Sequence, residues 1–138
     1  MINESLINPK SIVVVGASNN INKPGGKLLS NIINGKFGGE LYVVNPKESN
    51  VQNIHSFKTV NEIPNTDLAV LAIPAKFCLE TVKILAYQKN TKAFIIISAG
   101  FSEVTEEGKQ LEQEIVKVIS KVGGCLIGPN CIGVLNTN

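Results

Sequence analysis

Several residue types on which protein functions often depend are scarce in this sequence. It has no tryptophan, a single histidine, His55, and three cysteines, Cys78, Cys125 and Cys131. Three cysteines cannot all pair with one another, and none of them forms a Cys-x-x-Cys motif. Because one histidine adds little to a ligand set, we expect no metal site in this chain.

Charge is also low, at 17% of the residues, and the formal net charge is only +2. The sequence has neither a stripe of lysine and arginine nor an RNA-binding aromatic motif, which argues against a nucleic-acid partner. The longest aliphatic runs are as short as strands, and residues 1–6 lack the features of a signal peptide. We therefore expect a soluble, cytoplasmic protein with no membrane partner.

What the sequence does have is apolar residues, which make up 43% of its 138 residues and suffice for the core of one domain covering 1–138. Five short apolar runs predict strands at residues 11–15, 40–44, 67–73, 93–97 and 125–127. Helical spacing of apolar residues separates most of them, at residues 25–33, from Pro74-Ala75 onward, and from Thr105 to Val122. Asn34-Gly35 and Gly123-Gly124 are typical helix ends.

Strands that alternate with helices and are apolar throughout are typical of a parallel sheet covered on both faces. The prediction is an α/β fold: a Rossmann-like, doubly wound, five-stranded parallel sheet in one three-layer domain. The segment 48–65 is poorly patterned, with only a short helical turn expected at 59–63, and we interpret His55 as a loop residue there.

In such a sheet, ligands bind beyond the carboxyl ends of the strands. Each predicted strand is followed there by glycine, proline or small polar residues, and we expect these segments to converge on one crevice. They are Gly16-Ala17-Ser18, Asn45-Pro46-Lys47, Ile73-Pro74-Ala75, Ser98-Ala99-Gly100 and Gly128-Pro129-Asn130-Cys131.

The loop after the first strand indicates an anion site, since small residues let a strand turn into a helix whose free N–H groups face the ligand. A dinucleotide fingerprint, Gly-x-Gly-x-x-Gly, is not present, because Ser18 stands where the second glycine belongs. Strand two ends in Asn45-Pro46-Lys47 and not in the acidic residue that binds a free ribose diol. A lysine there suits a ribose phosphate, which favours NADP or coenzyme A.

The five segments occur in the same order in a known family. The segments that carry the resemblance are Gly16-Ala17-Ser18, Val44-Asn45-Pro46-Lys47, Ala72-Ile73-Pro74-Ala75, Ile97-Ser98-Ala99-Gly100-Phe101 and the ending Gly128-Pro129-Asn130-Cys131-Ile132-Gly133. The chain resembles the CoA-binding domain of NDP-forming acyl-CoA synthetases from end to end. It is more distantly similar to the α subunit of succinyl-CoA synthetase, across 74–78 and 128–131.

The resemblance implies a ligase that makes an acyl-CoA from a carboxylic acid, CoA and a nucleoside triphosphate, through an acyl phosphate and a phosphohistidine. In the family the phosphohistidine lies in a following domain and the nucleotide in an ATP-grasp domain, so these domains would be its partners. The chain would then be an excised domain or the first module of a larger synthetase, with coenzyme A as its ligand.

The resemblance also implies roles for individual residues. Backbone at Gly16, Ala17, Ser18, Gly25 and Gly26 would approach the CoA phosphates, with charge from Lys23 or Lys27. Lys47, beside Asn45 and Pro46, would pair with the ribose phosphate. The adenine or pantetheine would lie against Ile73, Pro74 and Ala75, and the pantetheine arm would pass Ser98, Ala99 and Gly100. Asn130 and Cys131 would lie near the thiol end.

Ordinary structural readings compete with these roles. The glycines could form only a tight turn, Lys47 could be a solvated surface lysine, and 73–75 and 98–100 could only start a helix and a turn. A nucleophilic cysteine needs a base or a cation beside it, so we assign no catalytic residue, Cys131 included. Two other functions stay open: an NADP-binding module of an oxidoreductase or redox regulator, and a free-standing CoA-binding protein without catalysis.

Overall fold

The computed structural model describes residues 3–97, 106–127 and, as backbone, 134–136. Its helices are α1 (Glu4–Ile7), α2 (Pro24–Asn34), α3 (Ala75–Gln88) and α4 (Glu106–Lys121), with a 3-10 turn η1 (Val60–Glu62). Its strands are β1 (Ser11–Val15), β2 (Glu40–Val44), β3 (Asn50–Val51), β4 (Ile54–Phe57), β5 (Leu68–Leu71), β6 (Ala93–Ile96), β7 (Cys125–Ile127) and β8 (Val134–Asn136).

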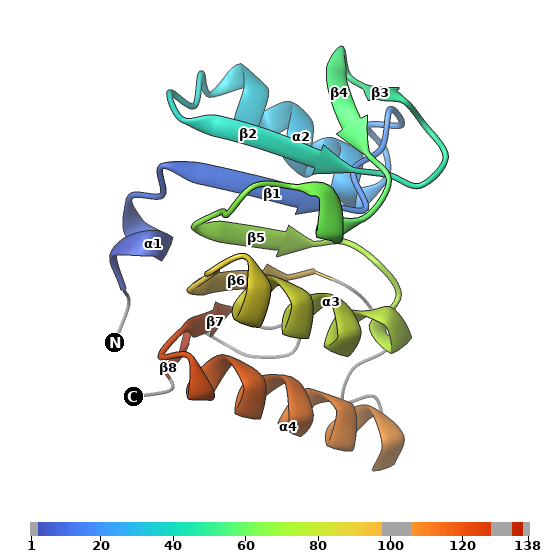
Figure 1. Ribbon diagram of the computed structural model, residues 1–138. Helices are drawn as coiled ribbons and strands as arrows, with labels where there is room; N and C mark the ends of the chain where they lie inside the picture. Colours follow the sequence, from blue (N-terminus) through green and yellow to red (C-terminus); the bar gives the residue numbers. More distant parts are fainter. Residues whose placement is uncertain (1–2, 98–105, 128–133, 137–138) are drawn as a thin grey trace.

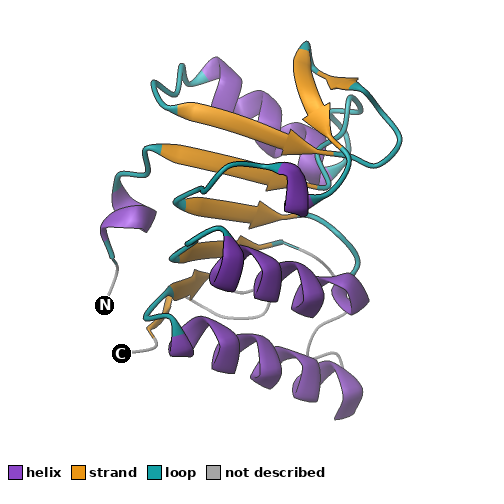
Figure 2. Ribbon diagram, viewed as in Figure 1, coloured by secondary structure: helices purple, strands orange, loops and turns teal. Residues whose placement is uncertain are grey.

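The strands form one sheet in the order β3-β4-β2-β1-β5-β6-β7-β8. From β4 to β7 the neighbours pair in parallel, while β3 and β8 are antiparallel additions at the two edges. Helices α3 and α4 cover one face, and α2 covers the other (Figures 1 and 2). The doubly wound α/β prediction is confirmed, and the five predicted strands are β1, β2, β5, β6 and β7.

The predicted number of strands is wrong, because β3, β4 and β8 add to the five within the described residues. Two of them lie in the segment 48–65, for which only a helical turn was expected; that turn is η1. His55 lies on β4 and not in a loop, with its side chain exposed and 5.3 Å from the Phe57 ring, centroid to centroid. Short two-to-four-residue strands give too little alternation to be recognised from sequence.

The central strands are apolar without interruption because both faces of the sheet are covered. On β1, Val13 and Val15 pack in the core under α3 and α4, whereas Ile12 and Val14 pack on the α2 side. The predicted apolar face of α3 is confirmed as well, with Cys78, Val82, Leu85 and Ala86 all buried.

The glycines expected at the helix ends take the expected left-handed conformation after α4 but not after α2. Gly123 takes a left-handed conformation, with φ of +71°, just after α4, as expected of a glycine at a helix end. After α2, however, Gly35 stays right-handed with φ of −77°, and the left-handed residue is Lys36, with φ of +55°.

Gly16 is the glycine on which the fold places the strictest demand. Its φ is +88°, and a Cβ built there would collide with the carbonyl oxygen of Ala72 and lie 3.0 Å from Cγ2 of Ile73. We expect Gly16→Ala to lower the free energy of unfolding by about 2 kcal/mol or more, measured by urea denaturation.

Gly38→Ala is the matched control for this prediction. No atom lies within 4 Å of a Cβ at Gly38, and its backbone is not left-handed, so we expect a change within about 0.5 kcal/mol. Equal effects of the two substitutions would contradict the packing described at Gly16.

Candidate functional site

The carboxyl ends of the central strands lie in register at one edge of the sheet. Val15 of β1 pairs with Val44 of β2 on one side and with Leu71 of β5 on the other. Hydrogen bonds continue one residue further, from Gly16 N–H to the Val44 carbonyl (3.1 Å) and from Ala72 N–H to the Val15 carbonyl (2.8 Å). Three predicted segments, 16–18, 45–47 and 73–75, therefore start side by side at this edge.

The loop from 16 to 23 has its own internal hydrogen bonds. The Ser18 hydroxyl oxygen accepts from the Asn20 N–H at 2.9 Å, and the Asn20 side-chain oxygen accepts from the Asn22 N–H at 2.9 Å. Lys23 donates its N–H to the Asn20 carbonyl at 3.1 Å. Among the described residues the Ser18 hydroxyl only accepts, so its proton is available to a further acceptor.

Gly25 and Gly26, in the first turn of α2, are buried and in close contact with the same loop. A Cβ at Gly25 would collide with the Gly16 carbonyl, and one at Gly26 with the Asn20 carbonyl. The space that a side chain would need is thus filled by the chain's own backbone. Both glycines are required for α2 to begin this close to β1, whatever the loop binds.

The N-terminus of α2 has neither a capping side chain nor an acidic residue to offset its positive dipole end, and it is called open here for that reason. Its N-cap residue, Lys23, gives no side-chain hydrogen bond, Pro24 occupies the first turn, and that turn has no acidic residue. Helix α3 begins at the same edge, after Pro74, again without a side-chain cap or an acidic first turn. Free N–H groups and the helix dipole make such ends favourable positions for an anion.

Asn45 links the end of β2 to the loop after β1. Its side-chain N–H donates to the Ala17 carbonyl at 2.9 Å, while its side-chain oxygen accepts from the N–H groups of Lys47 (2.7 Å) and Glu48 (3.1 Å). The amide thus fixes both the turn that carries Lys47 and the distance of that turn from the loop. Pro46 and Lys47 are exposed.

The third segment forms the entry to α3. Ile73 and Ala75 are half-buried and Pro74 is exposed. The Cys78 thiol, one turn into the helix, donates to the carbonyls of Ile73 (3.8 Å) and Pro74 (3.7 Å). An apolar surface therefore lies beside the loop at 16–18, since a Cβ built on Gly16 would lie 3.0 Å from Cγ2 of Ile73.

The sequence analysis missed Gln52, at the tip of the β3–β4 hairpin. Its side-chain N–H donates to the carbonyls of Ser18 and Gly26, each at 2.9 Å. The available signal was Val51-Gln52-Asn53-Ile54, two polar residues between apolar ones, which is the pattern of a tight hairpin.

Some predicted site residues lie outside the described part of the chain. These are Ser98, Ala99, Gly100, Asn130 and Cys131.

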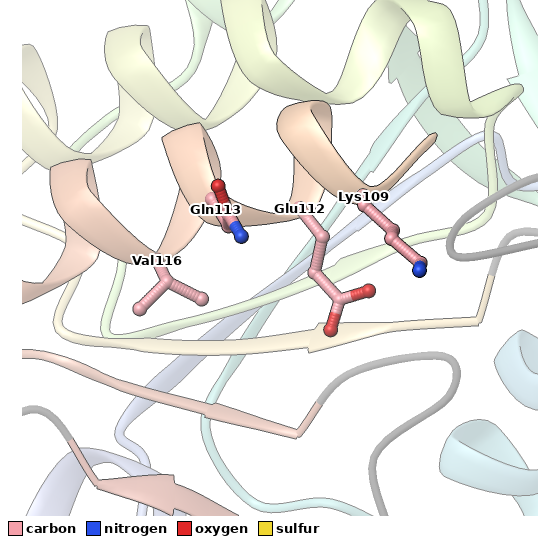
Figure 3. A pocket seen from close by; sticks show the side chains of 4 residues that line it. All are labelled: Lys109, Glu112, Gln113 and Val116. Carbon is pink, nitrogen blue, oxygen red and sulfur yellow. The ribbon is translucent and has the colours of Figure 1, made fainter. Parts of the chain in front are cut away.

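A pocket of about 390 Å³ lies against α4, and its described lining residues are Lys109, Glu112, Gln113 and Val116 (Figure 3). None of the predicted site residues that the structure describes, from Gly16 to Ala75, lines it. Among the residues that the structure covers, no cluster of three metal-ligating side chains occurs, and no helix is long and apolar enough to cross a membrane.

The mostly parallel sheet, with two uncapped helix N-termini at its carboxyl edge, defines a domain of the Rossmann-like class. The family model of the CoA binding domain matches residues 10–137. The chain belongs to that family, and the resemblance deduced from the motifs is confirmed.

Two curated relatives and one solved structure illustrate the similarity. The chain is 43% identical, over 95% of its length, to the α subunit of an ADP-forming acetate–CoA ligase II from Pyrococcus furiosus, and covers 28% of that protein. It is 40% identical, over 96% of its length, to a trans-feruloyl-CoA synthase from an unknown prokaryote, covering 19% of it. The solved structure is an acetyl-CoA synthetase from Candidatus Korarchaeum cryptofilum, with 31% identity and a TM-score of 0.82, over 97% of this chain and 29% of that one.

The chain therefore spans less than a third of the length of these relatives. It is a CoA-binding domain homologous to the α subunits of ADP-forming ligases, and the NADP-module alternative is not favoured.

The contact between Asn45 and Ala17 can be tested by an isosteric substitution. Asn45→Asp keeps the oxygen that the turn needs but replaces the donor with an anionic oxygen against the Ala17 carbonyl. We expect the free energy of unfolding to fall by about 1 to 3 kcal/mol in urea denaturation at pH 7. Asn61→Asp, at an exposed position, is the control and should change it by less than about 0.5 kcal/mol.

Proposed function

We propose that this chain binds coenzyme A at the carboxyl edge of its sheet, as the CoA-binding module of an ADP-forming acyl-CoA synthetase. The observation that carries the proposal is the side-by-side position of the open α2 N-terminus and the Lys47 turn, bridged by the Asn45 amide. Together they offer two sites for phosphate, and CoA carries a diphosphate and a ribose phosphate.

In this proposal the diphosphate lies at the loop after β1. Helix α2 contributes N–H groups at Gly25 and Gly26, and the Ser18 hydroxyl donates its proton, which is not bonded within the loop, to the diphosphate. Lys23 and Lys27 are both exposed near this helix end and add positive charge. Gly16 and Ala17 supply the backbone turn that brings these groups together.

Lys47 is the partner of the ribose phosphate. Its backbone is held by Asn45 and preceded by Pro46, so its side chain projects from a fixed turn. The exposed side chain is available to a ligand, and an ammonium group is a strong partner for a phosphate. The apolar surface of Ile73, Pro74 and Ala75 would receive the adenine or the pantetheine, which needs contact more than hydrogen bonds.

The complete reaction would convert a carboxylic acid, CoA and a nucleoside triphosphate into an acyl-CoA, a nucleoside diphosphate and phosphate. We assign to this chain the holding and orientation of CoA, whose thiol attacks an acyl phosphate. The acyl phosphate, a phosphohistidine and the nucleotide would be handled by further domains or subunits of a longer protein, the phosphohistidine and ATP-grasp domains. The setting proposed is the cytoplasm, which fits the buried thiols of Cys78 and Cys125.

Titration calorimetry with CoA and with dephospho-CoA, which lacks the ribose phosphate, tests the proposed role of Lys47 directly. A charge-assisted contact contributes about 1.5 to 3 kcal/mol, so CoA should bind about tenfold or more tightly than dephospho-CoA. In Lys47→Met this ratio should fall towards one. Lys117→Met, at an exposed position late in α4, should keep the wild-type ratio.

Equal binding of CoA and dephospho-CoA by the wild type would remove the role of Lys47. Tight binding of NADP without binding of CoA would overturn the proposed function itself.

A further inference from the structure

The tip of the β3–β4 hairpin reaches over the loop that follows β1. Gln52 makes three hydrogen bonds to it: its side-chain N–H groups donate to the carbonyls of Ser18 and Gly26, each at 2.9 Å, and its backbone N–H donates to the Asn19 side-chain oxygen at 2.6 Å. Asn19 returns a bond to the Asn50 carbonyl at 3.3 Å. The hairpin tip and the loop after β1 thus each donate hydrogen bonds to the other.

The two carbonyls that Gln52 binds lie at the two ends of the loop. Ser18 follows the end of β1 at Val15, and Gly26 lies in the first turn of α2, which begins at Pro24. Between them, residues 19 to 24 are all exposed. One side chain therefore joins both ends of the exposed stretch.

The backbone at Gln52 indicates that this contact is not incidental. Gln52 and Asn53 have φ of +48° and +69°, the left-handed pair of a two-residue hairpin turn. Asparagine and glycine suit such positions, and glutamine does not. Gln52 thus has an unfavourable φ at the position from which its side-chain amide reaches the loop.

From these contacts we infer that Gln52 is a positioning residue for the CoA phosphates. It holds the loop at 18–26 in its binding shape before the ligand arrives. The inference rests on the proposed function and adds to it a residue that contacts the loop and not the ligand. The Lys47 turn is held by the Asn45 side-chain oxygen, a contact in which Gln52 takes no part, while the Asn45 side-chain N–H donates to the Ala17 carbonyl in the loop.

Loss of such a support weakens binding because the loop must then be ordered when the ligand binds. We expect Gln52→Ala to bind CoA about tenfold more weakly at 25 °C by calorimetry. Because Lys47 has its own support, the ratio of CoA to dephospho-CoA affinity should stay at the wild-type value. A residue needed only for folding would lower the melting temperature and leave the affinity of the folded protein unchanged.

Two further variants separate the hydrogen bonds from other effects. Gln52→Glu keeps the shape but cannot donate, and places a charged oxygen against two carbonyls, so it should bind CoA at least as weakly as Gln52→Ala. The control is Asn53→Gly, because glycine suits the left-handed backbone there and the exposed Asn53 side chain makes no hydrogen bond in the described structure, so this variant should bind CoA as the wild type does.

Hydrogen exchange of the free wild type tests the same inference without a substitution. The N–H groups of Asn20, Asn22 and Lys23 are bonded within the loop. They should be protected before CoA is added, and should lose that protection in Gln52→Glu. Fast exchange of all three in the free wild type would overturn the inference, even if neither Gln52 variant folds.

The other outcomes are also decisive. If the wild type binds CoA and both Gln52 variants bind it equally well, the inference is wrong and the proposed function stands. A CoA to dephospho-CoA ratio that collapses in Gln52→Ala would show action through Lys47, which also overturns it. If the wild type binds no CoA, the proposed function is wrong and the inference is wrong with it.

Discussion

Close contact between backbones at the end of β1 is the constraint on which the site depends. Gly16 lies against the Ala72 carbonyl, Gly25 against the Gly16 carbonyl, and Gly26 against the Asn20 carbonyl. A side chain at Gly16 would push the turn after β1 away from the end of β5, and one at Gly25 or Gly26 would push α2 away from that turn and its loop. Only this proximity brings the open end of α2 next to the turns that follow β2 and β5, because those strands end in register with β1.

Most of the fold could be predicted because its signals are local and repeated. Five apolar runs correspond to the five central strands, and the buried face of α3 at Cys78, Val82, Leu85 and Ala86 follows directly from helical spacing. The loops at the strand ends could be predicted too, because parallel strands that alternate with helices place all their carboxyl ends at one edge.

The parts that the sequence did not reveal depend on distant partners. Strands β3 and β4 have two and four residues, and their pairing with each other and with β2 decides that they are strands at all. The pattern around Gln52 indicates at most a tight hairpin, and it could not reveal the contacts of the side chain, because these are to carbonyls 34 and 26 positions away in the chain. Lys36 takes the left-handed conformation that Gly35 was expected to take.

The tip of the hairpin at Gln52 is fastened to the exposed loop 19–24 by polar contacts, whereas Val51 beside it and the central strands are held by buried aliphatic side chains. Regions with few apolar contacts open at a lower free energy than the core of the same domain. On warming, the exposed loop 19–24 would therefore detach from the Gln52 tip while β1, β5 and β6 were still intact, and the coenzyme A site proposed at this edge would be lost with it. Such a domain would lose its ligand before it lost its shape.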